Sequence, residues 1–424
     1  MSRSTRVPVT VRTLGSMGTP EAEAILPPTT CPPLPARDLW TACLLFVATL
    51  TVYAISNFYE GPTPYAYHVF QAQALLEGRL DLPHMPWLEL AEWEGRFYTV
   101  NPPLPALLLV PAVALFGAFP QGYASVLFGA INTALCFLVV ISFFRDRRVA
   151  LWTSLLSAFG TIHWYHAEVG SGWYFAHIVG ITFLWISLLL AARGAHLFWA
   201  SVMIGAAFLS RYPTALGGIF LPVYFFATLI SFEGGRPRIH PRPLLALLAG
   251  LVPALLLYFA YNYVRWGGPW DMGYTLVLRP GDPNYIYGLF NFRYIPIHLV
   301  EMFTTWPRVV EQPPYLVPSL FAMAIWIATP ALVLTLRAPL FDRLTVAAWA
   351  AVLLTAVVDL SHGGNGFTQF GYRHTLDFLP FLLLLVAAGM RGHVGRVTKS
   401  LVAASILVNT WGVVTLSVLR IHTF

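Results

Sequence analysis

A glutamate stands between the first long apolar run of the chain and the helical pattern that follows it. The stretch SNFYEGPTPYAYH (56–68) carries Glu60. Thr63 and Pro64 are residue types that begin helices and Gly78 is a type that ends them, so we expect one helix between them. Glu60 would then lie just before the positive end of this helix, where the field favours an ionised carboxylate able to accept a proton.

Two arginines stand beside apolar runs, where charged side chains are rare. Arg211 lies between two short runs, and ionisable residues in such places are functional by default. Arg373 belongs to the stretch QFGYRHTLDFLPF (369–381). A guanidinium group can fork onto the oxygens of a phosphate. Each arginine also has a structural interpretation, because Arg211 can reach lipid headgroups and Arg373 can pair with Asp377 one turn later.

The composition is that of a polytopic membrane protein. Hydrophobic residues make up 57% of the 424 positions, charged residues make up 10%, and the mean hydropathy is +0.66. Apolar runs of roughly 20 residues, the length that crosses a bilayer, recur along the chain. The three cysteines show no pairing or metal spacing, so we expect no disulfide framework.

The basic residues indicate a topology. We expect about eleven transmembrane helices near 39–57, 122–144, 149–165, 173–193, 196–210, 213–232, 244–265, 315–336, 344–361, 377–390 and 400–419. Alternate connections then carry the arginine clusters around 145–148, 236–242, 337–343 and 391–399. The positive-inside rule puts these connections in the cytoplasm, together with a disordered N-terminal tail (1–38). The net charge of +6 is therefore a topology signal, and we expect membrane lipids and no nucleic acid as partners.

Two long connections lie on the other side. PPLPALLLVPAVALFGAF (102–119) is short for a span, and counting it as one would invert every later loop. We therefore expect a juxtamembrane helix there, inside a first outer loop that covers 58–121. A second outer loop, 266–314, contains an amphipathic aromatic stretch typical of an interfacial helix. Long connections with helices of their own are usually functional.

Several of these features together resemble a known family. An acidic residue behind the first span, a helix ending ALLEGRLDLP, and the stretch EGRFYTVNPPLPALLLVP resemble the GT-C glycosyltransferases. The most similar branch is the protein O-mannosyltransferase and aminoarabinose-transferase-like group. LSRYPTALGGIFLP (209–222) and the 369–381 stretch resemble further, looser motifs of this family. The resemblance implies an all-α GT-C fold over 39–424.

The family transfers a sugar from a polyprenyl phosphate to an acceptor outside the cytoplasm. The resemblance therefore implies an inverting glycosyltransferase of the bacterial inner membrane, with Glu60 as the general base for a glycan, lipid or protein acceptor. Arg211 and Arg373 are then the candidate partners of the donor phosphate, and His68 could assist either group. The family often has Lys or His where this chain has Asn101, which becomes a further candidate donor contact.

A histidine-rich stretch completes the set of candidates. IHWYHAEVGSGWYFAH (162–177) offers His163, His166, Glu168 and His177 near the expected outer surface. Their spacing matches no strong metal signature, and the proposed reaction demands no metal, so we expect no metal or other cofactor. Among them we assign His166 and Glu168 to the binding of sugar hydroxyls.

Other interpretations of the same residues remain open. The chain could be a secondary transporter or lipid flippase, although we find no internal repeat of the kind that such proteins often carry. It could also be a non-catalytic assembly subunit, in which Glu60 would be a solvated loop carboxylate. We interpret Glu89, Glu92 and Glu94 as a solvated face, and His68 could pack within the loop.

Overall fold

The computed structural model describes residues 33–57, 63, 65–194, 196–278, 281–366 and 369–421, and these form an all-α fold with three short β-hairpins. Six helices are long and apolar enough to cross a membrane by length and composition. They are α1 (Ala36–Ser56), α4 (Gln121–Phe144), α7 (Gly172–Ala192), α11 (Pro241–Trp266), α15 (Arg343–Leu360) and α17, whose helical stretch Arg396–Val413 continues as one span to Val418. The chain is thus an integral membrane protein, as its composition predicted.

The remaining helices are shorter. They are α2 (Tyr67–Leu76), α3 (Leu104–Phe116), α5 (Arg147–Phe159), α6 (His163–Val169), α8 (Leu197–Ser210), α9 (Phe220–Tyr224), α10 (Phe226–Leu229), α12 (Gly273–Val277), α13 (Ile295–Thr304), α14 (Ile325–Ala328) and α16 (Leu379–Gly389). Segments of 3-10 helix cover Tyr212–Ile219, Pro283–Tyr285, Phe292–Tyr294, Pro330–Arg337 and Arg373–Phe378. Several of the eleven predicted spans therefore correspond to short or 3-10 segments, and the count of eleven stays a prediction.

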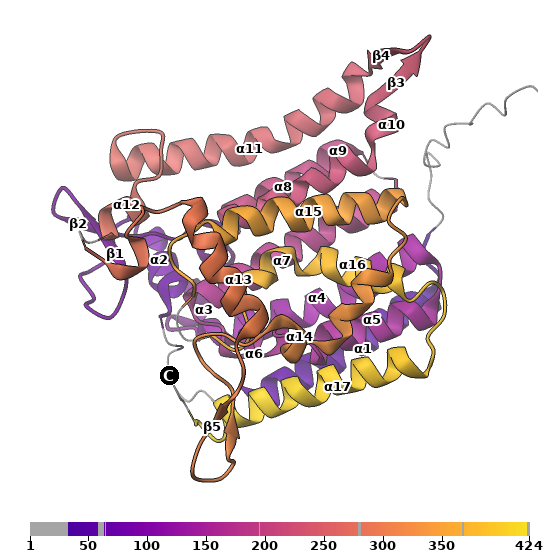
Figure 1. Cartoon of the computed structure of the whole chain (residues 1–424). Helices are drawn as coiled ribbons and strands as arrows, with labels where there is room; N and C mark the ends of the chain where they lie inside the picture. The colour runs from indigo at the N-terminus through magenta and orange to yellow at the C-terminus, as the bar shows by residue number, and fades with distance from the viewer. Residues whose placement is uncertain are drawn as a thin grey trace, which may run out of the picture.

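The helices run side by side as a bundle (Figure 1). α7 packs between α4 and α8, and α8 packs in turn against α11. α11 lies at the edge of the bundle, since only 17% of its apolar window is buried. One end of the bundle carries α2, α12 and the strands β1 (Leu90–Trp93) and β2 (Arg96–Thr99). The opposite end carries β3 (Ile230–Glu233) and β4 (Arg236–Ile239), and a third hairpin, β5 (Arg308–Val309) with β6 (Leu316–Val317), projects from the bundle.

Local sequence explains where several elements begin and turn. The Asp146 carboxylate accepts hydrogen bonds from the backbone N–H groups of Arg148 and Val149, which caps α5. Asp342 caps α15 in the same way. In the β1–β2 hairpin, Glu94 and Gly95 have φ values of 49° and 74°, the left-handed pair that a tight two-residue hairpin needs. Residues 90–99 therefore form a β-hairpin, where the sequence alone predicted only a solvated face.

The predicted span 213–232 differs from the structure. It consists of a 3-10 segment, the short helices α9 and α10, and strand β3. Pro213 and Pro222 lack the backbone N–H that a continuous helix needs. The intervening Gly217 lies so close to Phe381 that a Cβ atom there would be 2.5 Å from its ring. Hydropathy correctly identified an apolar segment here but could not show that it is broken.

The loop behind α1 is partly as predicted. α2 forms in the expected stretch, and Gly78 follows it with a φ of 69°. The predicted cap is wrong, because the Thr63 hydroxyl instead accepts a hydrogen bond from the backbone N–H of Gly122 at the start of α4. α3 has 13 residues, which agrees with the short helix predicted for 102–119. α13 forms within the predicted amphipathic stretch of the second loop.

The division of the chain into a tail (1–38) and a membrane domain (39–424) stays a prediction. α1 begins at Ala36, three residues before the predicted boundary of the tail at 39. Residues 1–32 lie outside the described part of the chain, as do Glu60 and Cys31. Cys43 and Cys136, which the structure does describe, are both free thiols.

Candidate active site

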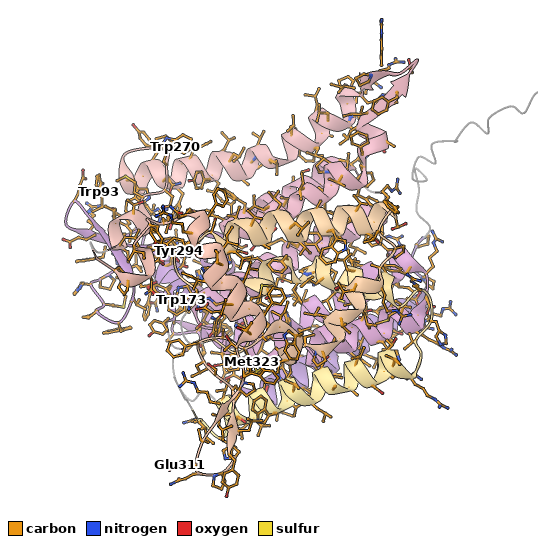
Figure 2. All side chains as sticks on the ribbon, in the orientation of Figure 1. Trp93, Trp173, Trp270, Tyr294, Glu311 and Met323 are labelled. Carbon is orange, nitrogen blue, oxygen red and sulfur yellow. The ribbon has the colours of Figure 1, made fainter. Side chains whose placement is uncertain are left out.

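A large cavity opens at the end of the bundle that carries β1 and β2. Its volume is about 690 Å³, and Arg373 lies in its lining, so we call it the Arg373 cavity. The hairpin contributes one wall, α12 and the segment after it a second, and residues 362–366 a third. Figure 2 shows Trp93 of the hairpin and Trp173 of α7 at this same end. Segments from four distant parts of the sequence thus enclose one polar space.

Both the side chain and the backbone of Arg373 make contacts that hold the residue in place. Its guanidinium carbon lies 5.3 Å from the centre of the Trp173 ring, within the range of a cation–π contact. Its backbone N–H donates to the Gln369 side-chain carbonyl at 2.7 Å. Trp173 in turn packs against Tyr65, with ring centres 4.8 Å apart. The arrangement presents a guanidinium group to the cavity on a rigid aromatic support.

Acidic side chains line the same cavity. Glu89, Glu92 and Asp282 all contribute to its walls. The protein around Glu89 raises the pKa of its carboxyl group by desolvation, and the nearby Arg373 guanidinium opposes part of that rise. The backbone N–H of Glu89 donates to the Tyr67 hydroxyl at 2.8 Å, which joins the residue before β1 to α2. Glu89, predicted to belong to a solvated face, is exposed and contributes to the same cavity lining as Arg373.

Arg211 belongs to a buried ionic cluster near this cavity. Its Nε atom lies 2.8 and 3.0 Å from the two carboxylate oxygens of Asp377. Its Nη2 atom lies 3.2 Å from Nδ1 of His374 and 4.0 Å from Asp359. Asp377 therefore pairs with Arg211, not with Arg373 as its position one turn after Arg373 had suggested. Both arginines named from the sequence lie at the same end of the bundle, but in different surroundings.

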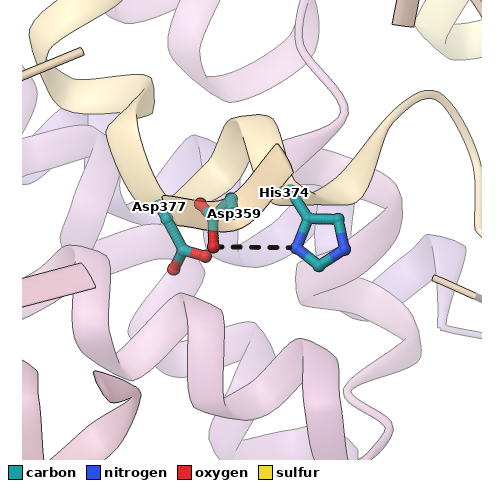
Figure 3. Close-up of side chains that lie close together, drawn as sticks. All are labelled: Asp359, His374 and Asp377. Carbon is teal, nitrogen blue, oxygen red and sulfur yellow. Dashed lines mark ion pairs between the residues drawn. The ribbon is translucent and has the colours of Figure 1, made fainter. Parts of the chain in front are cut away.

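The cluster also contains the one group of described residues that has metal-ligand geometry. Ligand atoms of Asp359, His374 and Asp377 all lie within 4.8 Å of one another (Figure 3). The Arg211 guanidinium, however, contacts Asp377 and His374 directly and approaches Asp359. A metal ion bound by all three side chains would need the space that this guanidinium fills. The cluster therefore fits an arginine as its cation, and we assign no metal to it.

The histidine-rich stretch does not form one site. His163 lies 3.1 Å from the Tyr53 hydroxyl and 3.2 Å from the Asn132 amide, whereas His177 lies beside Asp377. His166 is buried with its Nδ1 atom 2.7 Å from the Ile162 carbonyl. The buried Glu168 accepts a hydrogen bond from the Ser417 hydroxyl. The binding of sugar hydroxyls by His166 and Glu168 stays a prediction, since neither residue lines the Arg373 cavity.

His68 is fully buried and also lies outside the lining of the cavity. Its Nε2 atom lies 3.1 Å from the Gly172 carbonyl, and its backbone N–H donates to the Gln121 side chain at 3.1 Å. Burial lowers the pKa of His68 to about 4, so the ring is neutral at pH 7. These contacts join α2 to the starts of α4 and α7, which is the packing role that the sequence had left open.

Asn101 is connected through Thr99 to Arg265, an arginine that the sequence analysis did not identify. Asn101 is buried and donates to the Thr99 hydroxyl at 3.0 Å. The Thr99 carbonyl accepts from Nη1 of Arg265 at 2.8 Å, and Arg265 also bonds Asn262 and approaches Asp271 within 3.4 Å. The Arg265 side chain is fully buried. A charged residue in the last turn of an apolar span was the signal that could have found it.

Glu60 lies outside the described residues, but the chain on both sides of that gap is described. Asn57 and Thr63 both lie against Gly122, where a Cβ atom would be 3.2 and 3.1 Å from their side chains. Tyr65 lines the Arg373 cavity. Asn57 and Thr63 therefore lie together at the start of α4, and Tyr65 lies in the lining of the cavity.

Comparison with solved structures identifies the fold. The chain has the GT-C fold. ArnT from Cupriavidus metallidurans bound to undecaprenyl phosphate superimposes with a TM-score of 0.54 at 17% identity, covering 85% of this chain and 61% of ArnT. ArnT in the apo state gives a TM-score of 0.51, also at 17% identity, covering 86% of this chain and 62% of ArnT.

A looser match is the oligosaccharyltransferase from Archaeoglobus fulgidus, with a TM-score of 0.42 at 14% identity, covering 90% of this chain and 55% of that one. No family model and no curated protein sequence matches the chain. The chain thus spans less than two thirds of the length of these solved structures. The predicted resemblance to the GT-C glycosyltransferases is confirmed at the level of the fold.

Proposed function

We propose that this protein is an inverting glycosyltransferase that moves a sugar from a polyprenyl-phosphate donor to an acceptor on the extracytoplasmic side of the membrane. The observation that carries the proposal is the Arg373 cavity, which lies in a GT-C fold and combines an arginine with carboxylates and aromatic rings. The ArnT structure that shares this fold contains undecaprenyl phosphate, a lipid of the class proposed here as carrier. A glycan, a lipid or a protein side chain would serve as acceptor.

The reaction needs two kinds of groups. The leaving group is a lipid phosphate that is already anionic, so it needs positive charge or hydrogen-bond donors rather than an acid. Arg373 and Arg211 are the proposed phosphate partners, and the buried Arg265 near Asn101 is a third candidate. The acceptor hydroxyl needs a base, for which we propose Glu60. A single displacement with one base inverts the sugar carbon.

The cavity supplies surfaces suited to a sugar. Its aromatic residues Trp173, Tyr274 and Tyr285 offer faces for a sugar ring, and Glu89, Asp282 and Asn284 offer hydrogen-bond partners for hydroxyl groups. Ligand pockets commonly combine such surfaces with a few convergent polar groups. In the proposed arrangement the phosphate would lie at the arginines and the sugar would lie in the cavity.

The test is incubation of the purified full chain with a panel of polyprenyl-phosphate sugars, with release of free polyprenyl phosphate as the readout. The proposal expects release with at least one donor and an acceptor, and its loss in the Glu60→Gln variant. A lipid flippase would instead move labelled lipid across vesicles without releasing lipid phosphate. Lipid movement without sugar transfer would therefore contradict the proposal.

A further inference from the structure

We propose that Asp377 is a positioning residue, which holds the Arg211 guanidinium in the orientation that binds the donor phosphate. This inference rests on the proposed function, since it assumes that Arg211 contacts that phosphate. It adds a role for a residue that the catalytic scheme above does not use.

Asp377 joins segments that are far apart in the sequence. Its carboxylate accepts from Nε of Arg211 at 2.8 Å, lies 3.1 Å from Nδ1 of His177, and accepts a hydrogen bond from the Thr214 hydroxyl. These partners come from the end of α8, from α7 and from the 3-10 segment after α8. The Asp377 side chain is completely buried. Its carboxylate is therefore fixed from several sides, and it can fix the arginine in turn.

The contact uses only one side of the guanidinium group. Asp377 occupies Nε, and His374 lies 3.2 Å from Nη2, but Nη1 has no hydrogen-bond acceptor among the described residues. The Arg211 side chain also retains 18% of its exposure. A phosphate binds a guanidinium best through two parallel N–H groups. The pairing with Asp377 thus leaves an edge of the group for a second anion.

The orientation of the Arg211 side chain depends on its contacts, because this residue lies outside both neighbouring helical segments. Arg211 lies at the break between α8 and the 3-10 segment, and its extended φ of −160° places it in neither element. An arginine side chain has much rotational freedom to lose on binding. A contact that removes this freedom in the unliganded protein leaves less to be lost when the phosphate binds. Asp377 makes that contact.

A neighbouring carboxylate provides a matched comparison. Asp359 is also buried but lies 4.0 Å from Nη2 of Arg211, beyond hydrogen-bond distance. Asp359→Asn should therefore disturb the orientation of Arg211 less than Asp377→Asn. The exposed pair Glu233 and Arg238, 2.7 Å apart in the β3–β4 hairpin at the other end of the bundle, is a control for loss of an arginine–carboxylate contact in general.

The experiment measures the dissociation constant of undecaprenyl phosphate for the full chain in nanodiscs, with the thermal midpoint recorded for each variant. Loss of a charge-assisted contact changes an equilibrium by roughly tenfold or more. We expect Asp377→Asn to weaken binding by about that factor. Asp359→Asn should weaken binding less, Glu233→Gln should leave it unchanged, and Asp377→Glu should restore part of the affinity.

A double-mutant cycle separates positioning from a general loss of structure. If Asp377 acts through Arg211, then Asp377→Asn should have little further effect on binding once Arg211→Ala is present. An equal weakening in the Arg211→Ala background would overturn the proposal, and so would a lowered thermal midpoint with unchanged affinity in the single variant.

The same measurements distinguish the failure of this inference from the failure of the proposed function. If Arg211→Ala weakens binding but Asp377→Asn does not, only the positioning role is wrong. If Arg211→Ala binds undecaprenyl phosphate as well as the wild type, both Arg211 as a phosphate partner and Asp377 as its positioning residue are wrong. Absence of sugar transfer with every donor, tested separately, would contradict the function itself.

Discussion

The guanidinium carbon of Arg373 lies 5.3 Å from the centre of the Trp173 ring, although the two residues are far apart in the sequence. The ring belongs to the first turn of α7, and Arg373 begins a 3-10 segment in the last third of the chain. Their contact places a cation in the lining of a cavity of about 690 Å³ whose other charged residues include Glu89 and Asp282. A buried or semi-enclosed cation of this kind binds an anion more strongly than one on an open surface.

Replacement of Arg373 should therefore weaken use of the donor. Arg373→Ala should raise the KM for the donor by roughly 10- to 100-fold, because a contact to a charged group contributes about 1.5–3 kcal/mol. The KM of Arg373→Lys should lie between those of the wild type and Arg373→Ala, because lysine keeps the charge and loses the planar guanidinium group. Donor titrations of the purified variants check this, with the exposed Arg96 of the same end of the bundle as control. Equal KM values for all variants would exclude Arg373 as a phosphate partner and leave Arg211 and Arg265 as the candidates.

Replacement of Glu60 should remove the chemistry and spare the binding. Glu60→Gln keeps the size of the side chain but cannot accept a proton, so kcat should fall by about 10²- to 10⁴-fold, as is typical of the loss of a general base. Glu60→Asp should keep a trace of activity, because its carboxylate is drawn back by one methylene group. Single-turnover assays give these rates. The matched control is Glu77→Gln, which changes only an exposed pair with Arg79. Wild-type turnover in the Gln variant would exclude Glu60 as the base.

The stability of the protein should depend on pH through His68. Its pKa is lowered to about 4 by burial, whereas the ring titrates near its ordinary value of about 6.5 in the unfolded chain. The unfolded state therefore binds the proton first, and stability falls as the pH falls from about 6.5 to about 4, by up to about 3 kcal/mol. Above that window the contribution is constant.

Thermal midpoints measured between pH 7 and pH 4.5 check this dependence. His68→Gln keeps hydrogen-bonding capacity and removes the titration, so its midpoint should change less over this range than that of the wild type. An identical acid dependence in both proteins would show that other groups account for it.

The topology follows from the arginine clusters and can be tested by reporter fusions. Fusions after Arg148, Arg242 and Arg396 should report the cytoplasm, because positively charged connections are retained there. Fusions at Gly95 and Gly281 should report the outside, together with the Arg373 cavity whose walls lie beside them. A cytoplasmic signal at Gly281 would contradict this orientation and the interfacial placement of α3.

The sequence by itself determined the class of the protein and much of its local structure. Hydropathy is a property of neighbouring residues, so it identified the long apolar helices and the short α3 without any tertiary contact. The motifs around Glu60, Arg211 and Arg373 indicated the GT-C fold that the comparison with ArnT supports. The interruption of the segment 212–233 was not predicted, because an apolar composition does not distinguish a continuous helix from a chain interrupted by prolines and closely packed glycines.

Only the tertiary structure decided which polar residues meet. Asp377 pairs with Arg211, 166 positions away, rather than with Arg373 four positions away. His163 and His177, close in the sequence, lie in separate networks, and Arg265 lies beside Thr99 of the β-hairpin. In an apolar interior every charged group needs a partner, and the partner is supplied by whichever helix packs alongside. Sequence spacing specifies the face of a helix on which a side chain lies, but the packing of helices distant in the chain determines what that face contacts.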